Sequence, residues 1–300
     1  MSEPQGDDLV RTETFEVAGP LDLDISVTLG RIDIELTDTA EATVEVRHAP
    51  DIRESWAQGV TNLLNWVNER FGEQFGGELR GSPVEAVQQT RVELTGRRLA
   101  VRAPKPLPLR NIPLAVTVRA PAGSGLEIRA GSADVNVTGA CGRVDVLTGS
   151  GEVKLDRAEG AAQVRTGSGA IRLGPTLAGL QLRTGSGDVE ASSLAGSVTL
   201  VTGTGDVWLG AAAGEIMARS GSGDLSVAEA ASGSLELITG SGEIRVGVRP
   251  GVTAEVDLTS GSGKVSSELD VETEAPEGEV PLKIRARTGV GSAVLTRATQ

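Results

Sequence analysis

The sequence predicts an all-β protein, a parallel β-solenoid (β-helix) with a short helical insertion. A Thr-Gly-Ser-Gly-like tetrapeptide recurs at a fixed interval, and apolar residues alternate with polar ones between its copies. The 300 residues include 40 glycines, whereas aromatic residues make up only 2%. A core without large rings has to be built from Val, Leu, Ile and Ala in thin layers, and stacked coils provide such layers.

The tetrapeptide keeps an interval of 18 residues over most of its copies. The copies begin at Thr148, Thr166, Thr184, Thr202, Ser220, Thr239 and Ser260, with a relative at Ala130 and a degenerate copy at Thr288. A flexible linker has no reason to hold such a register, so each interval indicates one coil of about 18 residues. The longer steps after Thr239 are interpreted as insertions at one edge of the same unit.

Two alternating patterns lie within each interval. With the Thr counted as position 1, apolar residues occupy positions 6 and 8, as in Val189/Ala191, and positions 15 and 17, as in Val198/Leu200. This predicts two strands per coil, each with one buried face. Parallel stacking would pair each strand with its neighbours at about 4.8 Å. Antiparallel hairpins are the alternative architecture, and the crossover rule favours a right-handed coil.

The chain is expected to divide into three parts. Residues 1–9 are expected to be disordered, 10–129 to form an irregular β region, and 130–300 to form the regular solenoid. Within the second part, Val92–Val101 is typical of a hairpin with its turn at Thr95–Arg97.

A helical insertion is predicted at about 51–90. Its first part has apolar residues at helical spacing, and Ser82-Pro-Val-Glu resembles a capping box that opens a second, shorter helix. An open solenoid end exposes unpaired backbone, so the insertion is expected to cap the N-terminal end. Contact with a protein partner or a membrane surface is the alternative. The residues of this candidate cap or partner surface are Trp56, Val60, Leu63, Leu64, Trp66, Val67 and Phe71.

Several of these motifs resemble one bacterial family. The TGSGDV and TGSGEI units, the lead-in Val116-Thr-Val-Arg-Ala-Pro, and the closing Ile284-Arg-Ala-Arg-Thr-Gly are similar to a domain-of-unknown-function family of β-strand-repeat proteins described as "putative adhesins". The likeness covers about residues 10–300, except for 51–90. It implies the solenoid fold and a link to the cell envelope.

Composition excludes several classes of function. A net charge of −13 argues against nucleic-acid binding, which depends on Lys and Arg. The single cysteine, Cys141, excludes an intramolecular disulfide and a cysteine-based zinc site. We expect a cytoplasmic location, with possible peripheral association with the envelope, because the N-terminal residues lack a signal-peptide pattern. No apolar stretch is long enough for a transmembrane helix.

No catalytic, cofactor or metal site is predicted. We interpret the tetrapeptides as a structural turn ladder of Thr148, Thr166, Thr184, Thr202, Ser220 and Thr239, not as a phosphate cradle. The position-3 hydroxyls, Ser150, Ser168, Ser186, Thr204, Ser222, Ser241 and Ser262, are expected to stack and hydrogen-bond to one another. The acidic residues at position 5, Asp134, Glu152, Asp188, Asp206, Asp224 and Glu243, indicate a solvated column, with calcium binding as the alternative.

The sequence favours a non-catalytic scaffold that self-associates or presents a protein-binding surface. The coil containing Val290–Leu295 is expected to leave an open C-terminal end that favours end-to-end association. Two alternatives remain: carbohydrate or envelope binding near the outward-pointing Trp208, and membrane attachment through the Trp-rich helix. The lone His48 has no nearby nucleophile in sequence and is not expected to catalyse a reaction.

Overall fold

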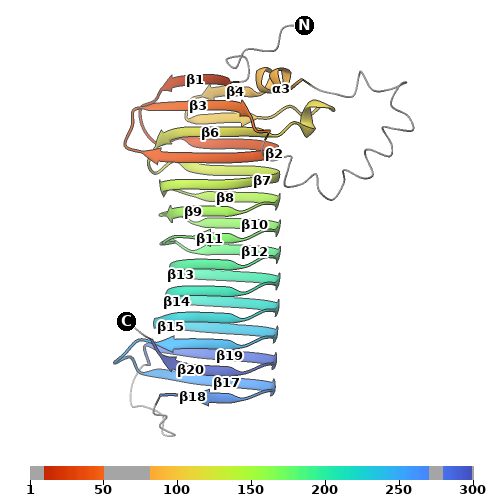
Figure 1. The fold of residues 1–300 in the computed structure, drawn as a ribbon. Coiled ribbons are helices and arrows are strands. Elements are labelled where there is room, and N and C mark those ends of the chain that lie inside the picture. Colours follow the sequence, from red (N-terminus) through yellow and green to blue (C-terminus); the bar gives the residue numbers. More distant parts are fainter. Residues whose placement is uncertain (1–9, 51–81, 270–279, 299–300) are drawn as a thin grey trace, which may run out of the picture. The chain divides into compact units, whose positions relative to one another are not determined.

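The computed structural model describes residues 10–50, 82–269 and 280–298 (Figure 1). The chain divides into two compact units. The first comprises the residues up to Gly139 together with Thr148–Ser150, and the second comprises Ala140–Leu147 and the residues from Gly151 onward. Over the described ranges, twenty strands are accompanied by one α-helix and one 3-10 helix, which confirms the all-β class.

A long strand organises the first unit. The elements of this unit are β1 (Val10–Glu16), β2 (Asp22–Thr37), β3 (Glu41–His48), α3 (Pro83–Gln89), β4 (Arg91–Thr95), β5 (Arg98–Arg102), η2 (Leu109–Asn111), β6 (Leu114–Pro121) and β7 (Gly125–Cys141), of which the last two residues belong to the second unit. Strand β2 pairs in parallel with β7 along one edge, and with β5 and then β6 along the other. Antiparallel β3 and β1 extend the sheet beyond β6.

The predicted hairpin is present, because β4 and β5 pair antiparallel around Gly96. The shorter predicted helix, α3, also begins where expected, with Ser82 as its N-cap and Pro83 in its first turn. The capping box is wrong, however, because Ser82 makes no side-chain cap hydrogen bond. Glu85 instead accepts a hydrogen bond from Gln89 Nε2, one turn along the helix, at 2.7 Å.

Helix α3 packs against β1 and β3 at one end of the first unit. Ala86 and Val87 are fully buried there. The Arg11 guanidinium of β1 donates hydrogen bonds to the carbonyl oxygens of Gln88 (2.9 Å) and Thr90 (2.6 Å). The described part of the predicted insertion therefore covers strands, whereas residues 51–81 lie outside the described ranges.

The second unit consists of coils in parallel register. Its strands are β8 (Val144–Ser150, the last three residues belonging to the first unit), β9 (Val153–Ala158), β10 (Ala162–Ser168), β11 (Ile171–Leu173), β12 (Leu180–Ser186), β13 (Val189–Thr204), β14 (Val207–Ser222), β15 (Leu225–Ser241), β16 (Ile244–Val248), β17 (Ala254–Ser262), β18 (Val265–Ser267), β19 (Leu282–Val290) and β20 (Ala293–Arg297). The partners Leu182, Leu200 and Ala218 follow one another at 18-residue steps. Such pairing contradicts antiparallel hairpins and defines a β-solenoid-like arrangement.

The core of this unit lies at the predicted positions. Val189, Ala191, Val198 and Leu200 are all buried, and so are their counterparts in the neighbouring coils. A further buried column at position 11 was not predicted, and it contains Ala158, Thr176, Leu194, Ala212 and Ala230. In β13, β14 and β15 this position belongs to a third paired segment of the coil. Its mixture of Ala, Thr and Leu provides no alternating signal in the sequence.

The last coils do not stack in the order of the chain. Strands β19 and β20 pair with β15 and β16 on one side and with β17 and β18 on the other (Figure 1). The expectation that the coil containing Val290–Leu295 forms the open end is therefore wrong, because this coil is covered on both sides. Within this unit, the coil paired along only one described edge is β17–β18.

Charge gives a physical reason for this order. Glu236 of β15 lies opposite Arg285 of β19, and Arg285 lies opposite Asp257 of β17. Stacking in chain order would place Glu236 opposite Asp257, and like charges on directly opposed strand residues destabilise a sheet. The basic strand β19 separates the two acidic neighbours.

Candidate interaction surfaces

The predicted turn ladder is held together by the threonines. Thr166, Thr184, Thr202, Ser220 and Thr239 are successive register partners and are buried. Each threonine of this set donates its Oγ1 hydrogen to the carbonyl oxygen two residues later, as Thr202 does to Thr204 at 2.9 Å. The side chains thus close the turns from inside.

The turn amides are also engaged. Gly187 N donates to Thr204 O at 3.1 Å, and Gly205 N donates to Ser222 O at 3.0 Å. A phosphate cradle needs backbone amides that point freely at the ligand. Since these amides bind the next coil, the tetrapeptide has a structural role.

The position-3 hydroxyls follow the expected column only in part. Ser168, Ser186, Thr204, Ser222 and Ser241 are successive partners. The column is broken after Ser241, because Val290 lies opposite both Ser241 and Ser262. In the first unit, Ser150 Oγ donates to Ser132 Oγ at 3.0 Å.

The acidic column makes hydrogen bonds that the sequence did not predict. Asp188 Oδ1 accepts from Asp206 N (2.9 Å), Asp206 Oδ1 from Asp224 N (2.8 Å), and Asp224 Oδ1 from Glu243 N (2.7 Å). The backbone amides at positions 4 and 6 donate to carbonyl oxygens of the following coil. The amide at position 5 instead points toward the preceding coil. The carboxylate supplies the missing acceptor there. The column is therefore structural, and the described ranges hold no cluster of three or more metal-ligating residues.

Cys141 is not suited to nucleophilic chemistry. Its side chain is fully buried, and Sγ donates to Arg157 O at 2.9 Å. Burial raises the pKa of the thiol to about 11, so the group is protonated at neutral pH. His48, the candidate not expected to catalyse a reaction, is the last residue of β3 and pairs with Leu114 of β6.

A buried carboxylate in the first unit also has a structural role. Asp24 on β2 accepts hydrogen bonds from Arg98 Nη2 (2.7 Å) and Arg102 Nη2 (2.8 Å), both on β5. Burial opposes ionisation of Asp24, but the hydrogen bonds from Arg102 and Arg98 outweigh it and lower its pKa. The same ion pair raises the pKa of Arg98. Asp24 is therefore ionised and shielded, which does not suit a general base.

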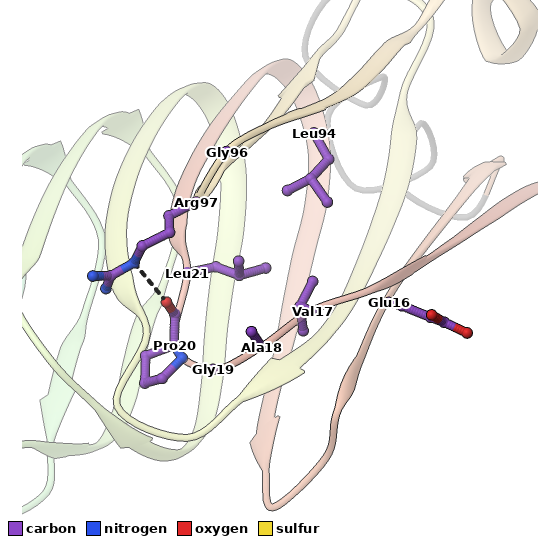
Figure 2. Close-up of a pocket in the computed structure, with 9 residues that line it drawn as sticks. All are labelled: Glu16, Val17, Ala18, Gly19, Pro20, Leu21, Leu94, Gly96 and Arg97. Carbon is purple, nitrogen blue, oxygen red and sulfur yellow. Dashed lines mark hydrogen bonds between the residues drawn. The ribbon is translucent and has the colours of Figure 1, made fainter.

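One pocket of about 330 Å³ lies in the first unit (Figure 2). It is lined by Glu16–Leu21, between β1 and β2, and by Leu94, Gly96 and Arg97 at the hairpin tip. Arg97 Nε donates to Pro20 O at 3.1 Å, and Figure 2 shows Glu16 pointing away from the other lining side chains. The wall is mainly apolar and brings no pair of catalytic groups together.

Trp208 is 43% exposed, on the outward face of β14. Its ring lies over Gly210, because a Cβ on that glycine would be 3.2 Å from Trp208 Cη2. Its register partners are Glu190 and Ser226. The other candidate surface, Trp56–Phe71, lies outside the described residues, and the described ranges contain no helix long and apolar enough to cross a membrane.

Parallel registers, glycine turns and buried threonines define a β-solenoid-like repeat protein. A family profile described as "Toastrack DUF4097" matches residues 111–287, which is more than half of the chain. The chain therefore belongs to this family, which is the family of the predicted resemblance.

The solved structures that match the chain are distant in sequence. A "putative adhesin" from Bacteroides fragilis is 12% identical over 95% of this chain and 96% of its own, with a TM-score of 0.45. A "putative adhesin" and a "putative lipid binding protein" from Parabacteroides distasonis are 12% and 10% identical, over 96% and 95% of this chain and 98% and 96% of their own. Their TM-scores are 0.33 and 0.29. No curated protein matches the sequence.

Proposed function

We propose that the protein is a non-catalytic scaffold, a parallel β-solenoid that presents a protein-binding surface. One observation carries this proposal: five described groups with catalytic potential, Asp24, Cys141, Asp188, Asp206 and Asp224, are engaged in holding the fold. The carboxylates of Asp188, Asp206 and Asp224 accept backbone amides, Asp24 is ion-paired, and the Cys141 thiol is buried.

The outward side chains supply the binding surface. Parallel pairing repeats them at about 4.8 Å along each column. Arg165 and Arg183 are partners in one such column, followed by Val201 and then Arg219. Regular arrays on stacked repeats suit extended protein partners rather than one small substrate.

The test is site-specific photo-crosslinking in living cells. A photoreactive amino acid replaces Arg183, Trp208 or Ala213, which lie on the three different segments of the coil. We expect a discrete adduct, identified by mass spectrometry, from one segment and not from the other two. Folded protein that gives no adduct from any of the three positions would contradict the proposal.

A second candidate, binding of carbohydrate or other envelope components, is favoured by the exposure of Trp208. Exposed aromatic rings can stack on sugar faces, so Trp208→Ala should abolish binding on a glycan array if this proposal holds. Binding that is unchanged in Trp208→Ala would contradict it. Membrane attachment through the Trp-rich helix and a cytoplasmic location remain proposals, and liposome flotation that compares wild type with Trp66→Glu tests the former.

A further inference from the structure

We propose that the open edge of the β17–β18 coil is a docking site for an extended segment of another protein with Lys or Arg at alternate positions and apolar residues between them. This inference rests on the proposed scaffold function and names the chemistry of its partner. A strand edge with unpaired amides and carbonyls can accept one further strand.

The coil is open along one edge in the described residues. Strand β17 pairs with β19, β18 pairs with β20, and neither has a second described partner. Val256 is 38% exposed, whereas its partner Ile284 is 2% exposed. Val265 is 49% exposed, whereas its partner Ala293 is fully buried. The apolar positions that the next coil covers elsewhere are thus uncovered here.

The opposite edge of β17 shows which side chains this strand accepts. Glu255 and Asp257 point outward, and β19 presents a basic row to them. Lys283 Nζ lies 3.8 Å from Glu255 Oε2, and Arg285 Nε lies 3.3 Å from Asp257 Oδ2. Between these cations, Leu282, Ile284 and Ala286 point inward and are buried.

The same charges argue against two other occupants. Pairing of two copies through this edge would bring the acidic rows of Glu255 and Asp257 together, and opposed like charges disfavour strand pairing. The adjoining stretch 270–279 of this chain contains five carboxylates and no Lys or Arg, so it meets the same repulsion. A basic strand from a different protein has complementary charges.

The probe is a fluorescein-labelled peptide with the sequence of residues 281–290, PLKIRARTGV, added to the full chain. We expect saturable binding in fluorescence anisotropy, weakened at least about tenfold by Glu255→Lys/Asp257→Lys. Glu215→Lys, an exposed acid on an interior coil, is the matched control and should leave binding unchanged. A peptide with Glu in place of Lys283, Arg285 and Arg287 should not bind.

A second variant tests whether the loss of binding comes only from disruption of the internal ion pairs of Glu255 and Asp257. Val256→Glu leaves Glu255 and Asp257 in place but puts a charge where the partner's apolar residues would pack, so binding should again fall about tenfold. Hydrogen exchange of wild type should show new protection confined to residues 254–267. A merely electrostatic attraction to the acidic protein would not protect these amides.

Three results would overturn the inference. The first is equal binding to wild type and both variants, and the second is no binding at about 1 mM peptide. The third is loss of protection at residues 282–290, because this would mean that the peptide displaces β19. If crosslinking adducts nevertheless form on an outward column, the scaffold function stands and only this docking site is rejected.

Discussion

The coil of β14 and the coil of β17–β18 carry the same tetrapeptide turn but have different surroundings. Strand β14 has a parallel partner along each edge, and its apolar residues Val207, Leu209 and Ile216 are at most 2% exposed. In β17–β18, Val256 and Val265 occupy equivalent positions and remain exposed. The repeat thus specifies the shape of a coil, whereas neighbours on both sides complete its burial.

The first and largest expected effect concerns coil stacking itself. Gly205→Ala should lower the free energy of unfolding by about 4 kcal/mol, from backbone strain and overpacking together. Gly205 has a φ of +121°, and a Cβ would lie 2.4 Å from Gly187 O. Gly251→Ala, with φ +80° and no atom within 4 Å, is the matched control and should cost about 1 kcal/mol. Urea denaturation measures both, and equal losses would show that close stacking is unimportant.

The second effect compares valines in the two kinds of coil. Val198→Ala should cost about 2 kcal/mol, because the fully packed side chain leaves a cavity. Val256→Ala should cost less than about 0.5 kcal/mol, because one side of it is already exposed. Comparable losses in thermal or urea unfolding would mean that the β17–β18 edge is covered in solution.

The third effect compares an ion-paired carboxylate of the first unit with the amide-binding acids of the coils. Asp24→Asn should cost about 1.5 kcal/mol at pH 7, since hydrogen bonds to charged groups are stronger than neutral ones. Because folding lowers the pKa of Asp24 below its ordinary 3.8, the stabilisation is present above that value and disappears as the pH falls through the folded pKa. The difference between wild type and variant should therefore shrink below about pH 4. A constant difference from pH 7 to pH 2 would contradict this origin.

The fourth effect tests the acidic column. Asp206→Ala should cost about 1 kcal/mol, because Asp224 N loses its acceptor, whereas Asp206→Asn keeps an oxygen at that place and should cost less. At the same position of the β17–β18 coil, Lys264→Ala should change stability by less than about 0.5 kcal/mol. If Asp206→Asn is as costly as Asp206→Ala, charge rather than the acceptor is what matters.

The smallest effect lies within the turn ladder. Ser220 Oγ is buried and has no hydrogen-bond partner in the described structure, so Ser220→Ala should change stability by less than about 0.5 kcal/mol. Thr202→Val, which removes the hydrogen bond to Thr204 O, should cost about 1 kcal/mol. Similar losses for the two variants would contradict the role given to the threonine hydroxyls.

The coil could be predicted from the sequence because its turns and buried positions repeat at a short, fixed interval along the chain. Alternation around Val198 and Leu200 identifies buried strand faces, and a glycine such as Gly205 recurs in each coil where the turn needs positive φ. The register of Thr166, Thr184 and Thr202 follows from the constant interval. The third segment was not predicted, because Ala158, Thr176 and Leu194 are all buried but differ in hydrophobicity.

The order of the last coils could not be read from spacing alone. A correct prediction would also have needed the charges. Glu236 and Asp257 would repel each other as neighbours, whereas Arg285 has the charge opposite to both. The hydrogen bonds of the acidic column were missed for a related reason. A strand pattern shows where Asp206 points, but not that the amide of Asp224 lacks a carbonyl on that side.

The interleaving of β19–β20 between earlier coils has a consequence for synthesis on the ribosome. Coils up to β15 can add to the growing stack in the order in which they emerge. The segment 254–267 emerges next, but its neighbour on the stack has not yet been translated. It must wait until residues 282–297 have left the exit tunnel, so the final two coils assemble together. A nonsense mutation just before Leu282 would remove the β19–β20 coil and leave the β17–β18 coil without its partner.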